Sequence, residues 1–404
     1  KVNFILGENY LADSLNGNCY PIFKSPGISL KNIVINNDTV KLTSQTKLFL
    51  DLYRSQIIGI TGTKGKSTTS SLIYNIFKLY YKNTLLAGNI GKPFFELIYL
   101  INRETKIICE LSSHQLYDID KAPHISVLLN IFQEHLDYYQ TYEDYQNAKF
   151  NIISKQDKTD ICVYNADNKI ITLKMNTESI KSVKYSFSLN NEVERGCFLR
   201  GDKIIYKDND FEEVVFIDNN GSRQIKGEHN LQNLMAAIIV CKLQGIDNKT
   251  INEGIKTMSG LKYRMEYIGN YGGIDFYNDS ISTIPESTIA AVKAIPNVHS
   301  LILGGFDRGI DYLELANFLV NSNVVVLIFI DNAGKRIMNL IKEIKNNKKL
   351  FLVNTLEEAV LIAKKETPYG KSCLLSPAAA SYGMFKSFEE RGEVFNYLCK
   401  KIKI

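Results

Sequence analysis

The stretch IIGITGTKGKSTTS, residues 57 to 70, has the composition of a phosphate-binding loop between a strand and a helix. The usual P-loop has a glycine five positions before its Gly-Lys-Ser/Thr, but that position is Ile60 here, and the nearest glycine is Gly62. A buried-type strand precedes the loop and a helix follows it, so we expect the N–H groups of residues 63 to 67 to face an anion. The alternative is a glycine-rich turn with an exposed lysine.

Two side chains of this loop and one nearby carboxylate predict a nucleotide with magnesium. Lys66 is placed to reach the terminal phosphates, and the Ser67 hydroxyl is placed to join a Mg²⁺ shell. Glu110 ends the strand-like run KIICE, where ligands bind a parallel sheet, and hard oxygen donors suit Mg²⁺. The alternative for Glu110 is a surface ion pair.

Composition narrows the class of protein. The chain has 404 residues, enough for two or three domains, with 45% hydrophobic and 23% charged residues. Its net charge of +5 comes from 48 basic and 43 acidic residues without basic blocks, so we expect neither a nucleic-acid partner nor a membrane surface. No apolar run reaches the ~20 residues of a membrane span.

The cysteines favour a cytoplasmic protein with reduced thiols, because they are odd in number and form no CxxC pair. They are Cys19, Cys109, Cys162, Cys197, Cys241, Cys373 and Cys399. The chain begins at Lys1 without methionine and without a signal-like segment, so we expect a segment that precedes it.

Hydrophobic periodicity predicts an α/β protein with three domains. Residues 1–50 give short strands and turns, and residues 51–259 alternate continuous apolar strands with helices, as in a parallel sheet covered on both faces. Residues 195 to 217 predict a small antiparallel subsheet within this domain. Residues 260–404 restart the strand and helix alternation as a second doubly wound unit.

The loop TGTKGKST resembles the nucleotide loop of the Mur ligases and their folylpolyglutamate synthase relatives. Further stretches, in this order, resemble the D-glutamate-adding branch of the Mur ligases. They are SPGI (25–28), GNIG (88–91), ELSSHQL (110–116), NIFQEHLDYY (130–139), GEHNLQN (227–233), YRMEYIG (263–269), NDSISTIPEST (278–288) and SPAAASYGMFKSFEERG (376–392). The match runs from about residue 20 to the C-terminus.

The resemblance implies an architecture with a Rossmann-like N-terminal domain, a central ATP-binding domain and a C-terminal amino-acid-binding domain. It implies ATP-dependent addition of D-glutamate to UDP-N-acetylmuramoyl-L-alanine through an acyl phosphate, in a monomer that closes around ATP. The implied ATP-binding residues are Gly62, Thr63, Lys64, Gly65, Lys66, Ser67, Thr68, Asn230, Asn233, Arg264 and Asp279. The implied substrate-binding residues are Gly27, Asn89, His135, Thr283, Arg308, Ser381 and Phe388.

The resemblance also implies two Mg²⁺ sites. Their ligands are Ser67, Glu110, His135 and a Lys149 that adds CO₂ to become a carbamate, and the catalytic residues are Lys66, His135 and Lys149. From the residues alone, His135 reads as a structural histidine and Lys149 as an exposed lysine of a polar helix. Asn230 and Asn233 share one face at the start of a helix, where they suit an adenine edge or an N-cap.

Three features depart from the family pattern. Ile281 stands where many members have lysine, and Arg308 replaces another lysine while keeping a bidentate cation for a carboxylate. The glycine-rich turn that binds uridine diphosphate is absent, so the N-terminal domain is expected to be partial. Two other functions stay open: a related ligase with another acceptor, and a noncatalytic nucleotide-binding homologue.

Overall fold

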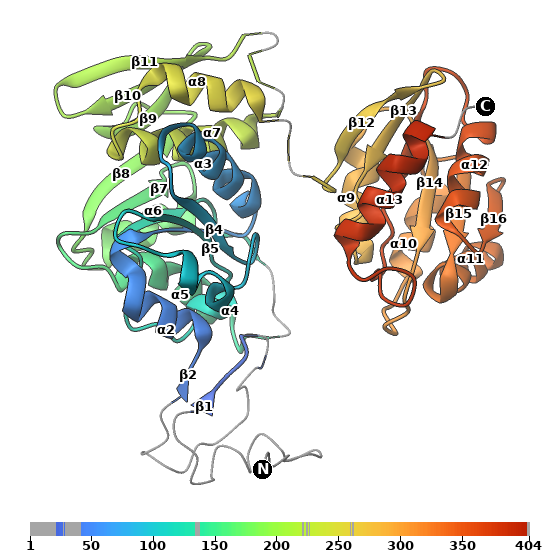
Figure 1. Cartoon of the computed structure of the whole chain (residues 1–404), viewed down its shortest axis with the longest axis horizontal. Coiled ribbons are helices and arrows are strands. Elements are labelled where there is room, and N and C mark those ends of the chain that lie inside the picture. Colours follow the sequence, from blue (N-terminus) through green and yellow to red (C-terminus); the bar gives the residue numbers. More distant parts are fainter. Residues whose placement is uncertain are drawn as a thin grey trace. The chain divides into compact units, whose positions relative to one another are not determined.

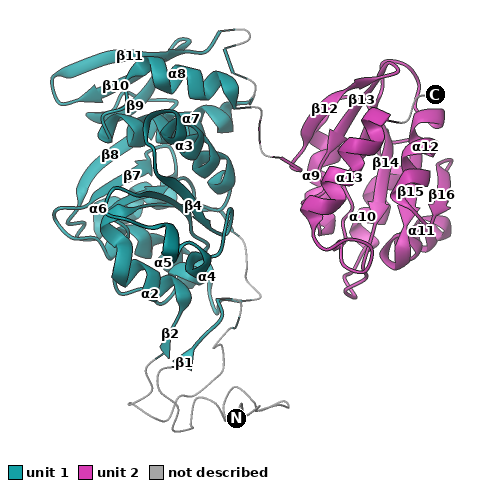
Figure 2. Cartoon of the chain, in the orientation of Figure 1, with its two compact units in different colours: residues 1–259 teal, residues 260–404 magenta. Residues whose placement is uncertain are grey.

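The computed structural model describes residues 22–26, 28, 42–133, 138–219, 222–223, 225, 227–258, 260 and 262–401. The chain divides into two compact units, residues 1–259 and 260–404 (Figures 1 and 2). Most of residues 1–50, including NFIL and NIVI, lies outside the described part. Within the described part of this region, a short parallel pair, β1 (Ile22–Phe23) and β2 (Leu42–Thr43), precedes the helix α2.

The first unit is built on one large sheet. Its strands are β3 (Ile57–Thr61), β4 (Thr84–Gly88), β5 (Lys106–Glu110), β6 (Ile125–Leu128), β7 (Ile161–Asn165), β8 (Val183–Ser188), β9 (Arg195–Arg200), β10 (Lys203–Asp208) and β11 (Phe211–Ile217). Among described residues they lie in the order β11-β10-β9-β8-β7-β6-β3-β5-β4. Only the β9-β10 and β10-β11 pairs are antiparallel, so the predicted subsheet is a continuation of the same sheet.

Helices cover both faces of this sheet. They are α2 (Gln45–Tyr53), α3 (Lys66–Tyr80), α4 (Ser113–Leu116), α5 (Tyr142–Ser154), α6 (Lys169–Thr177), α7 (Glu228–Leu243) and α8 (Asn248–Thr257), with 3-10 turns η1 (Arg54–Gln56), η2 (Phe94–Glu96) and η3 (Ile98–Leu100). Helices α3, α7 and α8 pack together on one face, and α2, α4, α5 and α6 contribute to the core on the other (Figure 1). Buried strands such as β3 therefore read as continuous apolar runs.

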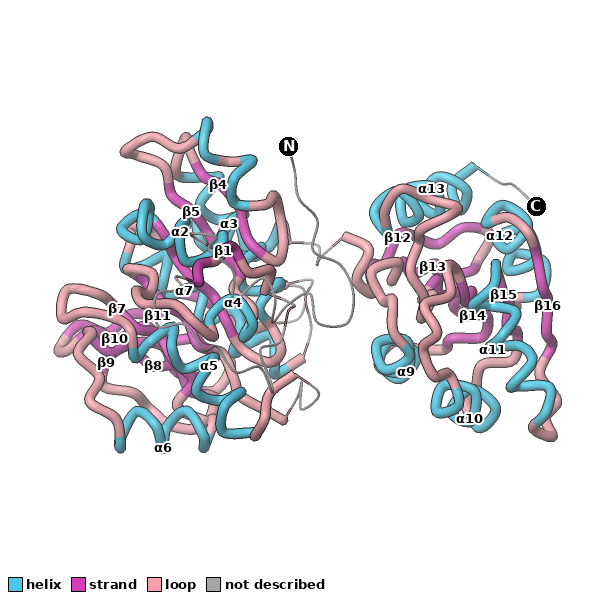
Figure 3. Tube along the Cα trace, turned by 90° about the horizontal axis from the view of Figure 1, so that it is seen from below, coloured by secondary structure: helices cyan, strands magenta, loops and turns pink. Residues whose placement is uncertain are grey.

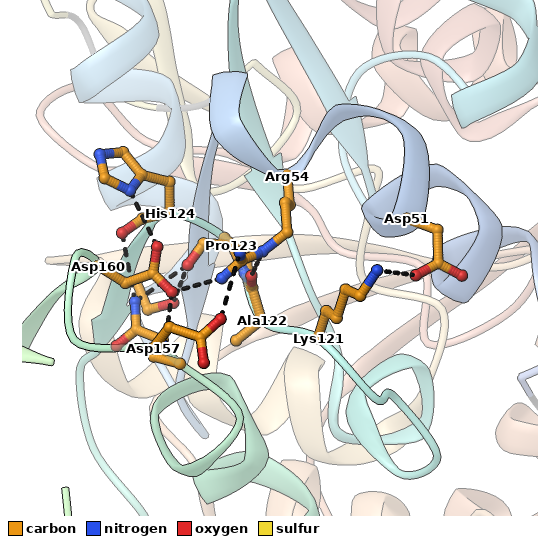
Figure 4. A network of polar contacts seen from close by, with 10 residues as sticks. Asp51, Arg54, Lys121, Ala122, Pro123, His124, Asp157 and Asp160 are labelled. Atoms are coloured by element: carbon orange, nitrogen blue, oxygen red, sulfur yellow. Dashed lines mark hydrogen bonds and ion pairs between the residues drawn. The ribbon is translucent and has the colours of Figure 1, made fainter. Parts of the chain in front are cut away.

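A polar network joins three strands of this sheet at their amino ends (Figure 4). His124 and Asp160 stand directly before β6 and β7, and Arg54 begins the turn η1 that precedes β3. The Asp160 carboxylate, 3% exposed, accepts bonds from the Arg54 guanidinium and from the Asp157 N–H at 2.8 Å, and lies 3.0 Å from His124 Nδ1. Arg54 Nε also donates to the Ala122 carbonyl at 3.0 Å. The buried carboxylate is thus fully partnered, as burial of a charge requires.

The second unit has a smaller mixed sheet. Its strands are β12 (Glu266–Tyr271), β13 (Ile274–Asn278), β14 (Val298–Gly304), β15 (Val326–Ile330), β16 (Lys349–Val353) and β17 (Ser372–Leu375). Their order among described residues is β12-β13-β17-β14-β15-β16, parallel except for β12. Helices α9 (Pro285–Ala294), α10 (Leu313–Asn321) and α11 (Asp331–Glu343) cover one face, and α12 (Leu356–Glu366) and α13 (Phe388–Lys401) cover the other (Figure 3).

Most predicted elements are confirmed within two or three residues of the expected ends. The helix predicted from residue 67 begins at Lys66, and the run KEIKNNKK is the end of α11 with a turn before β16. The helix expected near Asn230 begins at Glu228, and its N-cap is Gly227 without a side-chain bond, so the N-cap interpretation of Asn230 is wrong. In the described part of the chain, no helix has the length and apolarity to cross a membrane.

Candidate active site

The opening loop connects β3 to α3 at the carboxyl end of the sheet. Gly65 takes φ +88° at the helix N-cap, and a Cβ there would lie 2.4 Å from the Asn233 Oδ1 atom, so only glycine fits. Lys66 Nζ donates to the carbonyls of Gly62 at 2.8 Å and Thr63 at 3.0 Å. The loop and the Lys66 ammonium therefore form a positively charged turn at a helix N-terminus, which suits a phosphate.

Two of the five loop N–H groups expected to face an anion do not do so. The Thr63 N–H donates to the Asn130 carbonyl at 2.8 Å, and the Lys64 N–H donates to Asn130 Oδ1 at 2.8 Å. Asn130 Nδ2 returns a bond to the Lys64 carbonyl at 2.9 Å. Sequence reasoning gave Asn130 no role, yet its side-chain amide fixes the first half of the loop. The prediction for these two N–H groups is wrong because this asparagine follows the neighbouring strand β6.

Lys149 is a buried lysine, which corrects the expectation of an exposed one. It lies on α5 with 2% of its surface exposed, and its ammonium donates to the Gly62 carbonyl at 2.8 Å. The ammonium also lies 5.1 Å from the centre of the Tyr145 ring, whose hydroxyl is 2.8 Å from Thr63 Oγ1. Helix α5 therefore packs its lysine and tyrosine directly against the phosphate loop. A lysine is buried in this way only where polar partners offset its desolvation.

Glu110 ends β5, next to the strand from which the loop begins. It pairs with Ile60 in the sheet register and is 3% exposed. Its Oε2 atom has no hydrogen-bond partner among the described residues, which a buried carboxylate oxygen rarely lacks. The ion-pair alternative for Glu110 is wrong within this part of the chain, and an unsatisfied hard oxygen fits a divalent cation.

A cavity of about 280 Å³ lies beside the loop and brings three candidate residues of the first unit together. Lys66, Lys149 and Asn89 line it, and the Asn89 N–H donates to the Glu110 carbonyl at 3.0 Å. Its other lining residues are Pro26, Ser112, Ser113, His114 and Gln115. The stretch ELSSHQL was recognised only for its resemblance to the family, so its place in the cavity lining was not predicted. The capping box of Ser112 and Gln115 starts α4 beside the cavity, and its spacing is visible in the sequence, but that spacing does not indicate the cavity.

Asn230 and Asn233 share one face of α7, as predicted. Asn233 Nδ2 donates to Asn230 Oδ1 at 3.0 Å, and Asn233 is 3% exposed because it packs on Gly65. Ser67 and Thr68 lie in the first turn of α3, after the N-cap Gly65, and are half-buried. One end of α7 therefore contacts the phosphate loop.

In the second unit, Asp279 supports the turn that carries Arg264. Its carboxylate is 1% exposed and accepts from the Met265 N–H at 3.1 Å and from Ser376 Oγ at 2.7 Å. Burial raises the pKa of this carboxyl. In this structure the carboxylate supports a neighbouring turn, and ribose binding by Asp279 stays a prediction. Arg264 is exposed between two residues with positive φ, Tyr263 (61°) and Met265 (45°), a strain that often marks functional turns.

Thr283, Arg308 and Ser381 gather beyond the carboxyl ends of β13, β14 and β17. Arg308 Nη2 donates to the Thr283 carbonyl at 2.8 Å, and Phe306 pairs with Ala380, next to Ser381. Ser381 is 5% exposed, and Ser280 Oγ donates to the carbonyl of Phe388 at 2.8 Å. The four predicted amino-acid-binding residues therefore come from segments that contact one another.

Sequence reasoning gave no role to Arg391, the buried residue that joins these segments. Its guanidinium, 3% exposed, donates to the Ser280 hydroxyl at 3.0 Å and carbonyl at 2.8 Å, and to the carbonyls of Ala379 at 3.1 Å and Ala380 at 3.3 Å. Burial lowers its pKa to about 10.

Two predicted residues, Gly27 and His135, lie outside the described residues. Within the described ranges no group of three or more His, Cys, Asp or Glu side chains is arranged to hold a metal ion. Among the described residues of the first unit, Glu110 and Ser67 offer hard oxygen donors.

A phosphate loop on a parallel sheet places the first unit among nucleotide-binding α/β proteins, and the Mur ligase middle domain model matches residues 60–241. The Mur ligase MurF from Thermotoga maritima, solved with ADP, is similar in fold, with a TM-score of 0.57 and 18% identity over 98% of this chain and 94% of its own. A UDP-N-acetylmuramoylalanine--D-glutamate ligase from Lachnoclostridium phytofermentans is 33% identical over 100% of this chain and 88% of its own length. One from a Geobacillus strain is 35% identical over 95% and 83%. The chain therefore belongs to the UDP-N-acetylmuramoylalanine--D-glutamate ligase family.

Proposed function

We propose that this chain uses ATP to join D-glutamate to UDP-N-acetylmuramoyl-L-alanine during synthesis of the peptidoglycan precursor. The observation that carries the proposal is the cavity lined by Lys66, Lys149 and Asn89 at the carboxyl edge of the sheet. Full-length relatives with that name at 33 to 35% identity support the choice of substrates.

The chemistry has two steps. A carboxylate oxygen of the L-alanine residue attacks the γ-phosphorus of ATP, and ADP leaves. The amine of D-glutamate then attacks the acyl carbon, phosphate leaves with that oxygen, and the amine loses a proton. Lys66 would stabilise the charge on the transferring phosphoryl group, as lysines of such loops do. The residues proposed for the adenine are Asn230 and Asn233, and Arg264 is proposed for the phosphates.

Magnesium fits the donors present in the first unit. Ser67, Glu110, His135 and a carbamate on Lys149 would hold it at two sites, and it would neutralise triphosphate charge. The Lys149 ammonium would lose one proton, and the resulting amine would add CO₂ and release a second proton, which turns a buried cation into an anion. Incubation with ¹³C-bicarbonate should give one carbamate carbon signal that is absent from Lys149→Met, and its absence from the wild type would exclude the carbamate.

Residues of the second unit would bind D-glutamate. Arg308 would grip a carboxylate in bidentate fashion, with Thr283, Ser381 and Phe388 around the amino acid. Ile281 cannot bind a carboxylate, so the proposal requires that Arg308 suffices. The half-buried Ile281 N–H donates to the Tyr263 carbonyl at 3.1 Å, which gives this position a backbone role instead.

Organisation and location complete the proposal. We assign residues 1–50 to the UDP-binding domain together with Gly27, residues 51–259 to the ATP-binding domain and residues 260–404 to the amino-acid domain. A monomer in the cytoplasm is proposed, where ATP is available. The six described cysteines, all buried free thiols, are consistent with a reducing compartment.

The test is phosphate release from ATP with UDP-N-acetylmuramoyl-L-alanine, with and without D-glutamate, against L-glutamate, L-lysine and glycine. Release that requires both the nucleotide sugar and D-glutamate is expected. Release with another amino acid would assign a related ligase. ATP binding without any release would point either to a missing N-terminal segment or to a noncatalytic homologue, and a chain with that segment restored would tell which.

A further inference from the structure

The loop that carries Arg308 is fixed at its start and at its centre. The Phe306 N–H donates to the Ala380 carbonyl at 2.9 Å, which ties the loop to the segment before Ser381. The Asp307 carboxylate then accepts from the Gly309 N–H at 2.9 Å, and Gly309 takes φ +74° to make this turn. Arg308 therefore lies in a closed turn whose shape depends on the Asp307 carboxylate.

Arg336 of α11 holds the same turn from outside. Its Nη1 atom donates to Asp307 Oδ1 at 2.6 Å, and its Nη2 atom donates to the Ile310 carbonyl at 3.0 Å. Its guanidinium also lies 5.4 Å from the centre of the buried Tyr312 ring. One planar guanidinium thus bridges residues on both sides of Arg308, a task that its fork geometry suits.

The direction of the Arg308 side chain follows from this arrangement. Its guanidinium reaches the Thr283 carbonyl at 2.8 Å, although it lies on an exposed loop. A flexible loop would let so long a side chain sample many rotamers, and each binding event would then carry the cost of ordering it. A held loop reduces that cost.

We propose that Arg336 and Asp307 are a positioning pair that holds Arg308 toward Thr283, so that the site selects an amino acid with a carboxylate side chain. This inference rests on the proposed function. It deepens it by naming residues outside the predicted binding set that control the recognition of D-glutamate.

A plain surface ion pair is the competing interpretation, because the Arg336 and Asp307 side chains are 43% and 21% exposed. Exposed pairs contribute little to stability, so their loss leaves the fold intact. A surface pair also has no reason to bond the Ile310 carbonyl. The Arg336 bond lowers the pKa of Asp307, which keeps that carboxylate charged and able to accept both bonds.

The experiment compares Arg336→Met with Lys335→Met, an exposed neighbour on the same helix that serves as the charge-loss control. We expect Arg336→Met to raise the KM for D-glutamate about tenfold, the loss of one charge-assisted bond. The kcat and the KM values for ATP and the nucleotide sugar should stay within about twofold, and selectivity for D-glutamate over D-glutamine should fall. Lys335→Met should match the wild type.

Two further variants separate positioning from folding. Arg336→Lys keeps the charge but not the forked guanidinium, so its KM for D-glutamate should lie between those of the wild type and Arg336→Met. Asp307→Asn should raise this KM as Arg336→Met does. Equal KM values for wild type and Arg336→Met, or an equal loss for all three substrates, would overturn the inference. A wild type inactive with D-glutamate would instead overturn the proposed function, so the two failures are distinct.

Discussion

Buried polar groups at the two ends of the strands of the first sheet, here called its amino edge and its carboxyl edge, differ in how completely they are hydrogen-bonded. At the amino edge, Asp160 accepts bonds from Arg54 and from the Asp157 N–H and lies beside His124 (Figure 4). At the carboxyl edge, Glu110 is equally buried, but its Oε2 atom has no partner among the described residues. A buried carboxylate oxygen without a partner is the feature that we expect at a cation site.

The same contrast appears for the cations of this unit. Arg54 belongs to a polar network that joins three strands. Lys66 and Lys149 instead donate to a backbone carbonyl of the phosphate loop and line a cavity. We therefore expect the residues at the amino ends of the strands to contribute stability and those at the carboxyl ends to contribute chemistry. Substitutions at the two edges should accordingly affect different measurements.

The largest effect is expected from Lys66→Met. Without the ammonium, the charge on the transferring phosphoryl group loses its stabilising partner, so phosphate release should fall on the order of a thousandfold. The thermal midpoint should change by only a few degrees, because the side chain is not part of the core. Unchanged ATP turnover would show that the phosphate loop is wrongly assigned.

Glu110→Gln should lower the activity without lowering the stability. Phosphate release should fall about a hundredfold, and more Mg²⁺ should be needed for half-maximal rate, because an amide binds the cation poorly. The free energy of unfolding should stay equal or rise, since the variant removes a buried charge with an unsatisfied oxygen. Titration of rate against Mg²⁺ checks this, and a clear loss of stability would mean that Glu110 is structural.

Asp160→Asn should lower the stability of the protein without lowering its activity. It leaves Arg54 without its carboxylate and should lower the free energy of unfolding by about 2 kcal/mol. Below the unfolding transition, kcat should stay within twofold of the wild type. Urea unfolding combined with the phosphate assay measures both, and a large loss of kcat with intact stability would remove the distinction between the edges.

The smallest effect concerns His299, at the amino edge of the second sheet. Burial, with Lys371 and Lys349 nearby, lowers its pKa below the value of about 6.5 expected in the unfolded chain. The unfolded state then binds more protons as pH falls through that value, so stability should decrease there. His299→Asn should flatten the pH dependence of unfolding between about pH 5 and 7, and an unchanged slope would assign it to other groups.

Sequence patterns predicted the architecture well because buried parallel strands are continuous apolar runs. The strands β3 and β5, the helix after the phosphate loop and the shared face of Asn230 and Asn233 could all be derived from period and spacing. The loop itself was recognisable in spite of its unusual glycine spacing, because strand and helix flank it.

Long-range contacts were not predictable from spacing. Asn130 occupies two loop N–H groups, Lys149 is buried against Gly62, and Asp279 is covered by Ser376, each through residues far apart in the chain. Periodicity describes one element at a time, so it could assign Lys149 only to a polar helix. The cavity lining of Ser112 and His114 was missed for the same reason.

The most direct test of the central claim follows the oxygen atoms. UDP-N-acetylmuramoyl-L-alanine labelled with ¹⁸O in its carboxylate is incubated with ATP, Mg²⁺ and D-glutamate, and the phosphate released is analysed by mass spectrometry. The account predicts one ¹⁸O atom in each phosphate, because the carboxylate oxygen that attacks the γ-phosphorus leaves with it. Unlabelled phosphate would show that water receives the phosphoryl group, and would contradict the ligase chemistry assigned to the carboxyl edge.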